Sequence, residues 1–293
     1  MTIDISFSSI YEKIKVYGRM IKFSHTIFAL PFALSAVVLA HRETQVTFSG
    51  FFWILVAMVS ARSAAMGFNR VADYKIDAKN PRTDKREIPS GEISLFASIA
   101  FIMVFSVIFI FSAYMLGKLC FILSFPVLLV LFLYSLVKRF SAYCHIFLGF
   151  AIGLSPLGAW IAVTGTFSFA IIPLCLALMA NIAGFDILYA CQDTEFDKEN
   201  NLFSIPSKYG IKKAMRFSTY LHIISFVLFL LIQMVFSLGT IYFISVMVIG
   251  VALVIEHILV NPDDLTNINI AFFHMNSIIS VALFTGIFLD VLI

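Results

Sequence analysis

Nine apolar runs, each long enough to cross a bilayer as a helix, constrain this chain more than any other feature. A transmembrane helix needs about 17–25 predominantly apolar residues, and 61% of the 293 residues are hydrophobic while only 13% are charged. We therefore predict an all-α membrane protein, a bundle of nine transmembrane helices in a lipid bilayer. The runs cover residues 23–40, 51–68, 95–116, 119–137, 146–163, 169–189, 219–236, 241–258 and 271–293.

Three of the runs contain a proline, at Pro31, Pro126 and Pro156. Proline kinks a transmembrane helix but is tolerated there, because neighbouring helices can satisfy the backbone groups that it frees. We therefore predict that these three helices remain whole.

The basic residues are distributed very unevenly between the two ends of these helices. Of the 20 Lys and Arg residues, 17 lie in the N-terminal segment or in loops that nine spans place on the same side of the membrane. Only Arg42 and Lys118 fall on the other side, and Arg62 lies inside a span. Because basic loops stay in the cytoplasm, we expect the N-terminal segment and the charged loops to be cytoplasmic.

The chain has no feature that divides it into domains. Residues 1–20 are polar and charged and lack the apolar core and cleavage site of a secretory signal, so we expect a cytoplasmic segment there. No linker or low-complexity stretch follows, which predicts a single membrane domain over residues 1–293. The four cysteines are isolated, so we expect neither disulfides nor a cysteine metal site. We expect no nucleic-acid partner, and nothing in the sequence indicates the oligomeric state.

Acidic residues gather in two of the cytoplasmic loops. Asn69, Asp73 and Asp77 are spaced four residues apart at the end of the second run, so they form one stripe if that helix continues past the membrane. A comparable stripe follows the sixth run, at Asp186, Tyr189, Asp193 and Asp197.

Two such stripes on the same side of the membrane favour a metal site over a solvated surface. Like charges four residues apart destabilise a helix, so a compensating cation is expected. Mg²⁺ prefers oxygen ligands and completes its shell with water and substrate phosphates. We therefore predict that the two stripes hold a diphosphate between them through Mg²⁺.

Basic residues near these stripes suit the same chemistry. Arg62 lies too deep to be a membrane-surface anchor, and an intramembrane Arg is by default a functional residue. Lysine and arginine side chains stabilise the charge that builds on a leaving diphosphate. The candidates for this role are Arg62, Lys85, Arg86, Lys138 and Arg139.

The motifs that contain these residues resemble those of the UbiA superfamily of intramembrane prenyltransferases. "NRVADYKID" is similar to its first Asp-rich motif and "DILYACQDTEFD" to its second, while "KREIPSG" and "YSLVKRFS" resemble two further elements. The resemblance runs from about residue 22 to residue 210 and is strongest to the branch that prenylates 4-hydroxybenzoate.

The resemblance implies nine transmembrane helices around a central cavity in a bacterial inner membrane. It implies transfer of a polyprenyl group from polyprenyl diphosphate to the ring of 4-hydroxybenzoate, ortho to its hydroxyl, in quinone biosynthesis. The Mg²⁺ ligands would be Asn69, Asp73, Asp77, Asp193 and Asp197, with Asp73, Asp193, Asp186 and Tyr189 as catalytic residues. The substrate-binding residues would be Lys22, Arg62, Lys85, Arg86, Lys138 and Arg139.

Some residues depart from the family pattern and leave alternatives open. Lys22 stands where members carry Arg, and Glu87 stands where they usually carry Pro. The stretch "HIFLGFAIGLSPLGAWIAVTG" resembles a divergent branch linked to menaquinone made through futalosine, so another aromatic acid is an alternative acceptor. A divalent-cation transporter is an alternative of a different class. We assign no role to His25 or His145.

Overall fold

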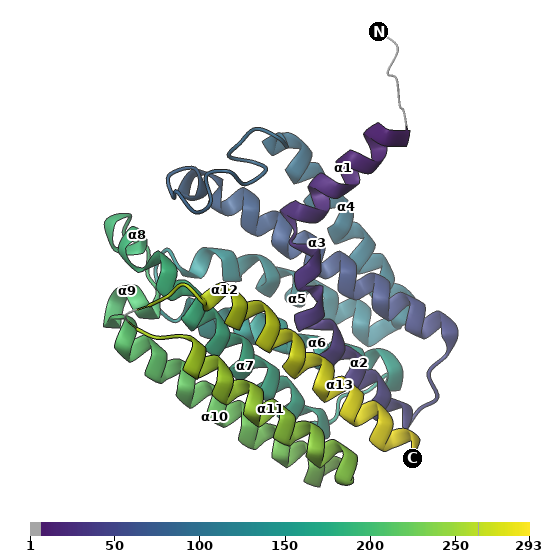
Figure 1. The fold of residues 1–293 in the computed structure, drawn as a ribbon. Coiled ribbons are helices and arrows are strands. Elements are labelled where there is room, and N and C mark those ends of the chain that lie inside the picture. Colours follow the sequence, from purple (N-terminus) through teal and green to yellow (C-terminus); the bar gives the residue numbers. More distant parts are fainter. Residues whose placement is uncertain (1–6, 263) are drawn as a thin grey trace.

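The computed structural model describes residues 7–262 and 264–293 (Figure 1). Within this part of the chain, nine helices are long and apolar enough to cross a membrane, which confirms the predicted all-α bundle. The protein is therefore an integral membrane protein. The spans are Phe23–His41, Phe48–Asp77, Leu95–Leu116, Lys118–Val137, Cys144–Thr164, Phe169–Glu199, Ile211–Phe236, Thr240–Leu259 and Phe273–Leu292.

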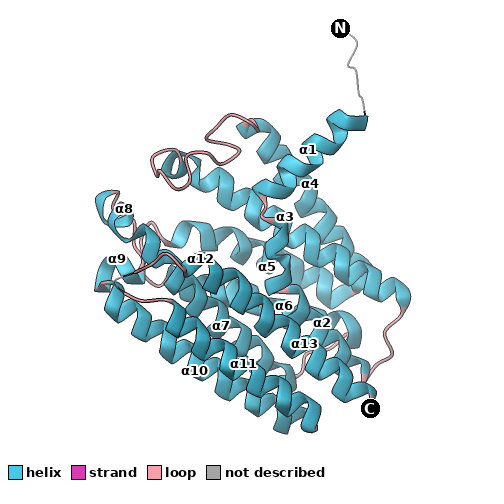
Figure 2. Ribbon diagram, in the orientation of Figure 1, coloured by secondary structure: helices cyan, strands magenta, loops and turns pink. Residues whose placement is uncertain are grey.

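Figure 2 shows helices throughout the described residues, with a long loop between α3 and α4. The elements are α1 (Phe7–Met20), η1 (Phe23–Phe28), α2 (Leu30–His41), α3 (Phe48–Asp77), α4 (Leu95–Leu116), α5 (Lys118–Val137), α6 (Cys144–Thr164), η2 (Phe169–Ile171), α7 (Ile172–Ala190), η3 (Cys191–Asp193), α8 (Thr194–Glu199), α9 (Ile205–Tyr209), α10 (Ile211–Phe236), α11 (Thr240–Leu259), α12 (Ile268–Ile270), η4 (Ala271–Met275) and α13 (Asn276–Leu292).

One of the three proline helices differs from the prediction. The first span divides into the 3₁₀ segment η1 and the α-helix α2, with Pro31 in the first turn of α2. A proline is favourable there because the first turn does not use its missing N–H. Pro126 and Pro156 lie inside unbroken helices, α5 and α6, as predicted.

The membrane helices form two adjoining groups. Six helices, α2, α6, α7, α10, α11 and α13, supply most of the main apolar core, in which Trp160, Phe229 and Tyr242 are fully buried, and α3 adds Ile54. The other three, α3, α4 and α5, pack against one another, and α5 also packs against α6. The boundary between the two groups contains the cavities described below.

Helices α6 and α7 approach closely because α6 presents glycine to its neighbour. A Cβ atom on Gly149 would lie 2.3 Å from the carbonyl oxygen of Met179, and one on Gly153 would lie 2.9 Å from that of Cys175. Small residues at such crossings allow two helix backbones to pack directly against each other. This contact brings the start of α6 next to the end of α7.

The charged connections gather at one end of the bundle. The loop between α3 and α4 and the short helices α8 and α9 lie on the same side, at the left of Figure 1. Met20 and Ile21, at the end of α1, pack against Ile88 and Ile93 of the α3–α4 loop. These contacts hold the loop over the end of α3, where the first acidic stripe lies.

Candidate active site

A polar cavity of about 330 Å³ opens at this charged end of the bundle. It lies between the end of α3, the end of α5, the start of α6 and the region from α7 to α9. Eleven of the thirteen predicted site residues line it, which are Lys22, Arg62, Asn69, Asp73, Asp77, Arg86, Lys138, Asp186, Tyr189, Asp193 and Asp197.

The other two predicted residues lie outside this cavity. Lys85 is exposed on the α3–α4 loop and does not reach the lining. Arg139 donates from Nη2 to the carbonyl oxygen of Ala72 at 2.5 Å, so it binds the backbone near the end of α3. Their sequence neighbours Arg86 and Lys138 do line the cavity. Adjacent side chains point in different directions, so only one residue of each pair reaches it.

The first acidic stripe forms as the spacing predicts. Helix α3 continues to Asp77, so Asn69, Asp73 and Asp77 share one face, and Asp73 and Asp77 are only 2% and 5% exposed. The amide nitrogen of Asn69 donates to Asp73 Oδ2 at 3.3 Å and to Ser135 Oγ at 3.4 Å. The carbonyl oxygen of Asn69 is therefore the atom left to bind a cation.

Each carboxylate of this stripe has a cationic partner. Lys138 Nζ lies 2.7 Å from Asp73 Oδ2, and Arg139 Nη2 lies 3.5 Å from Asp73 Oδ1. Arg86 Nη1 donates to both oxygens of Asp77, at 2.8 and 2.7 Å. These pairs compensate the negative charge of the buried carboxylates, because an unpaired buried charge is very unfavourable.

The second acidic stripe is not one helix, contrary to the simplest reading of its spacing. Helix α7 ends at Ala190, the 3₁₀ turn η3 follows, and α8 begins at Thr194. Asp186, Asp193 and Asp197 nevertheless line the same cavity, because the turn changes the direction of the chain but keeps it beside the cavity.

Asp193 is held mainly by Arg82, a residue that the sequence analysis did not single out. Arg82 donates from Nε at 2.8 Å to Asp193 and also pairs with it through Nη2, while its Nη1 donates to the Tyr189 hydroxyl at 3.0 Å. Burial opposes the charge on Arg82, but the hydrogen bonds and charge of Asp193 outweigh it and raise the pKa of Arg82. Asn80 Nδ2 adds a third contact to Asp193 at 3.1 Å.

Asp186 and Asp197 are partnered differently from the other carboxylates. His145 Nδ1 lies 2.7 Å from Asp186 Oδ2, and the backbone N–H of Ile205 donates to His145 Nε2 at 3.3 Å. An accepting Nε2 places the imidazole proton on Nδ1, from which it is donated to Asp186. Asp197 accepts a hydrogen bond from Ser204 Oγ at 2.8 Å.

Deeper in the membrane, two arginines hold the segment that leads from α1 into η1. Arg70 Nε donates to the carbonyl oxygen of Met20 at 3.0 Å, and Arg62 Nη2 donates to that of Lys22 at 3.1 Å. Lys22 lies close to several other cations. Partial burial, followed by the positive charges of Arg70, Arg86 and Arg82, lowers the pKa of Lys22. Such crowding of positive charge favours the binding of an anion.

The donor set fits Mg²⁺ bound together with a phosphate-bearing ligand. Among the residues that the structure describes, no three His, Cys, Asp or Glu side chains converge into a closed metal cage. Mg²⁺ rarely uses such cages: it takes one or two carboxylates and fills its remaining positions with water and phosphate oxygens. Asn69, Asp73 and Asp77 on one wall and Asp193 and Asp197 on the other offer oxygen ligands of that kind.

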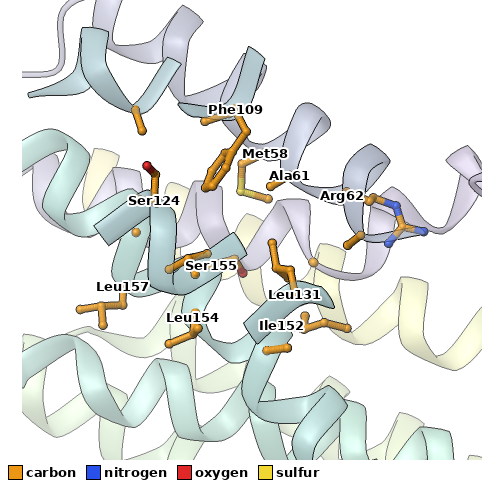
Figure 3. A pocket seen from close by; sticks show the side chains of 18 of the residues that line it. Met58, Ala61, Arg62, Phe109, Ser124, Leu131, Ile152, Leu154, Ser155 and Leu157 are labelled. Carbon is orange, nitrogen blue, oxygen red and sulfur yellow. The ribbon is translucent and has the colours of Figure 1, made fainter. Parts of the chain in front are cut away.

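A second, apolar cavity of about 300 Å³ continues from the polar one into the membrane (Figure 3). The two share part of their lining, including Arg62, Met66 and Tyr134. Figure 3 places Arg62 at one end of the view and Ser124 and Leu157 toward the other. Arg62 Nε is buried without a hydrogen-bond partner among the described residues, at the junction of the two cavities.

Several residues of this site carry no sequence signal of their own. Arg82 and Asn80 lie in the same charged loop as Lys85. Only the path of the loop in the folded protein brings Arg82 and Asn80 to the cavity and leaves Lys85 outside it. Ser135 and Ser204 are single serines in apolar or loop surroundings. His145 was visible as a lone histidine, but its partner Asp186 is 41 residues away.

Comparison with known proteins gives one family. The model of the UbiA prenyltransferase family matches residues 29–278. A polyprenyl transferase of Arthrobotrys oligospora is 32% identical over 171 residues, 57% of this chain and 44% of the fungal protein, so this chain spans less than half of that relative. A 4-hydroxybenzoate octaprenyltransferase of Francisella tularensis subsp. novicida is 25% identical over 80% of this chain and 82% of that protein.

Solved structures share the same fold. A UbiA homologue from Aeropyrum pernix K1 superimposes with a TM-score of 0.83 at 29% identity, covering 91% of this chain and 98% of that one. A UbiA homologue from Archaeoglobus fulgidus, bound to DMAPP and Mg²⁺, superimposes with a TM-score of 0.64 at 18% identity over 91% and 98% of the two chains.

Proposed function

Because the chain belongs to the UbiA prenyltransferase family, we propose that it transfers a polyprenyl group from polyprenyl diphosphate to the ring of 4-hydroxybenzoate, ortho to the hydroxyl. The enzyme class, a prenyltransferase, follows from the family. The donor, the acceptor, the Mg²⁺ dependence and a place in quinone biosynthesis are the proposal. The observation that carries it is a polar cavity walled by carboxylates and cations that continues into an apolar one.

The polar cavity suits a Mg²⁺–diphosphate complex. Five carboxylates and six Lys or Arg side chains line it among the described residues, so it offers ligands for the metal and donors for phosphate oxygens together. Mg²⁺, when bound, would neutralise the diphosphate as the C–O bond breaks. Asn69, Asp73, Asp77, Asp193 and Asp197 would hold the metal. The bound DMAPP and Mg²⁺ in the Archaeoglobus structure of the same fold support a metal and a prenyl diphosphate as ligands.

The apolar cavity suits the prenyl chain of the donor. Its lining is almost entirely aliphatic or aromatic, with alanine, leucine and isoleucine side chains on α3, α5 and α6. The allylic carbon would lie at the junction with the polar cavity, near Tyr134. An aromatic ring face there stabilises a carbocation through its quadrupole.

The side chains of this protein have separable tasks in the reaction. Arg86, Lys138 and Lys22 stabilise the diphosphate that leaves with the bonding electrons of the C–O bond. The acceptor ring then forms the new C–C bond and loses one proton. Asp186 lines the cavity and, among the described residues, hydrogen-bonds His145 through Oδ2, so its other oxygen would be available for the hydroxyl or the ring proton of the acceptor.

The acceptor is an aromatic acid in this proposal. Arginine binds a carboxylate through paired, charge-assisted hydrogen bonds, and Arg62 has a buried Nε without a partner among the described residues, at the junction. The octaprenyltransferase relative supports 4-hydroxybenzoate. Another aromatic acid, of the futalosine-type menaquinone route, is the alternative.

The ion pairs of the site argue against a divalent-cation transporter. Asp73, Asp77 and Asp193 each bind a Lys or Arg side chain in the cavity. Cationic walls repel a bare cation, whereas they bind a phosphate. We propose that the site opens to the cytoplasm of a bacterium from the inner membrane, since the basic loops lie at this end.

The test is a turnover assay with the purified protein in detergent. The protein is mixed with geranylgeranyl diphosphate, Mg²⁺ and one aromatic acid at a time, and products are identified by mass spectrometry. We expect a prenylated 4-hydroxybenzoate that disappears with EDTA and returns with added Mg²⁺. Product from another aromatic acid but none from 4-hydroxybenzoate would overturn the acceptor, and no prenylated product from any acid would overturn the reaction.

A further inference from the structure

Three basic side chains gather at the start of α10, which lies at the lower edge of the bundle in Figure 1. Lys212, Lys213 and Arg216 are exposed, and none of them forms an ion pair with a described acidic residue. The first turn of α10 contains no acidic residue, so the partial positive charge of the helix N-terminus adds to theirs. We call these three residues the basic face of α10.

The three cations point to one side of the helix. Successive residues of an α-helix are rotated by about 100°, so Lys212, Arg216 and Lys213 fall within an arc of about 100°. Tyr220 lies in the same arc, one turn beyond Arg216, and is 63% exposed. The opposite side of α10 is buried, and the helix packs against α7 and α11.

The basic face lies at the level of the lipid headgroups. Helix α10 has 26 residues, Ile211–Phe236, whereas about 20 residues cross the hydrocarbon layer. The short connection from α10 to α11 marks the far boundary of that layer, so counting back from Phe236 puts the near boundary at about Phe217. Arg216 and the two lysines lie just outside it, and the exposed ring of Tyr220 lies near the boundary, where aromatic side chains are favoured.

The same side of α10 continues into the membrane as an exposed apolar stripe. Ile223, Ile224, Val227 and Leu231 are 55%, 50%, 56% and 40% exposed. Their helical positions lie within the arc of the basic face. A lipid whose acyl chains pack along this stripe therefore has its headgroup next to the three cations.

We propose that the basic face of α10 and the apolar stripe below it bind an anionic phospholipid from the leaflet at the charged end of the bundle. Its phosphate oxygens accept charge-assisted hydrogen bonds from the lysine and arginine side chains. Basic clusters directly next to a transmembrane helix attract anionic lipids in this way. A soluble phosphate or an acidic protein would use the cations but leave the apolar stripe without a partner, so the lipid fits both features.

This site is separate from the proposed reaction. Among the residues that the structure describes, those lining the two cavities include none from α10. Lipid binding is measured without substrate, so its outcome and the outcome of the turnover assay are independent.

The test is native mass spectrometry of the full chain, titrated in detergent with phosphatidylglycerol or with phosphatidylcholine of identical acyl chains. We expect the unsubstituted protein to bind phosphatidylglycerol at least about tenfold more tightly, as expected for several basic side chains beside an anionic headgroup. The triple variant Lys212→Gln, Lys213→Gln, Arg216→Gln should lose this preference and bind both lipids equally. A preference that survives in the triple variant overturns the site.

The matched control is the triple variant Lys75→Gln, Lys79→Gln, Lys85→Gln. It removes the same charge from exposed positions at the same end of the bundle, on the end of α3 and the loop that follows. We expect it to keep the preference for phosphatidylglycerol. Equal loss in the two triple variants would make net charge the cause and overturn the site.

Two further measurements protect this result against a folding defect. Arg216→Gln alone should show the same loss at a smaller size, with an unchanged melting temperature in detergent. In the unsubstituted protein, the affinity for phosphatidylglycerol should decrease as NaCl is raised, because salt screens exposed charges. An affinity that does not change with salt contradicts a contact through these cations.

Competition with soluble anions distinguishes the lipid from other occupants. Inorganic phosphate and a glutamate-rich peptide are each added to the complex with phosphatidylglycerol. We expect neither to displace the lipid, because neither fills the apolar stripe. Displacement by inorganic phosphate would indicate a soluble phosphate ligand, displacement by the peptide would indicate an acidic protein partner, and either result overturns the proposal.

Discussion

Lys138 Nζ lies 2.7 Å from Oδ2 of Asp73, although the two residues are on different helices and Asp73 is 2% exposed. The carboxylate that the sequence marks as a metal ligand is thus paired with a lysine that the sequence marks as a phosphate donor. A Mg²⁺–diphosphate complex would bind both side chains at once, because the metal would bind the Asp73 carboxylate and a phosphate oxygen would accept hydrogen bonds from the Lys138 ammonium group. This relationship underlies the first prediction.

Asp73→Asn and Asp193→Asn should each lower Mg²⁺-dependent turnover at least about 100-fold, the size of effect seen when one group that stabilises transition-state charge is removed. Each change removes a metal ligand charge and leaves a cation unpaired, Lys138 or Arg82. Membrane insertion and the elution volume in detergent should not change.

Asp84→Asn is the control for both variants. Asp84 is exposed on the α3–α4 loop and does not line the cavity, so its turnover should equal that of the unsubstituted protein. Near-normal rates in Asp73→Asn or Asp193→Asn would show that the carboxylates do not serve the metal.

Lys22 should make diphosphate binding depend on pH. Partial burial and the neighbouring arginines lower the pKa of Lys22, so rising pH removes its proton earlier than that of an ordinary lysine. Only the protonated form attracts an anion, and a bound anion stabilises that form. The affinity for inorganic pyrophosphate with Mg²⁺ should therefore decrease as pH rises toward the ordinary lysine range.

Lys22→Arg should move this decrease to higher pH, because a guanidinium keeps its proton far above pH 10. Pyrophosphate titrations across alkaline pH would measure the shift. Lys85→Arg, at an exposed position outside the cavity, is the control and should leave the profile unchanged. Identical profiles in the Lys22→Arg variant and the unsubstituted protein would exclude Lys22 as the titrating group.

His145→Gln should lower kcat about tenfold with little change in the KM for the prenyl donor. His145 contacts Oδ2 of Asp186 and accepts a hydrogen bond from the N–H of Ile205, so it orients the carboxylate that would face the acceptor in the proposed reaction. The expected size is at the lower end of the loss of about 10–100-fold seen when a residue that orients a metal-binding side chain is replaced.

Steady-state kinetics with both substrates varied would test this positioning role. His274→Gln, at an exposed histidine, is the control. A variant of His145 that loses only thermal stability and keeps its kcat would assign His145 a structural role alone.

Gly149→Ala should destabilise the bundle, whereas Gly158→Ala should not. The added methyl group would lie 2.3 Å from the Met179 carbonyl oxygen in the first case and meets nothing within 4 Å in the second. Overpacking of this kind typically costs about 1–3 kcal/mol. Melting temperatures in the same detergent would compare the two, and equal melting temperatures would contradict the close α6–α7 contact.

The helix spans and the acidic stripe on α3 are determined by the sequence alone. Run length decides whether a helix crosses the membrane, and a spacing of four residues decides which side chains share its face; both are properties of a local segment. This is why the nine spans and the stripe from Asn69 to Asp77 could be predicted. The break between α7 and α8 could not, because the spacing of Asp186 to Asp197 is compatible with a continuous helix.

Only the tertiary structure decided which cation meets which acid. Arg82 and Lys85 are three residues apart in one basic loop, yet Arg82 binds Asp193 across the cavity while Lys85 is exposed. His145 meets Asp186 because glycines let α6 and α7 pack closely. Side-chain contacts between distant segments depend on how helices cross and loops turn, and no local pattern encodes that. The two cavities, and the open space beside Gly158, arise from the same packing.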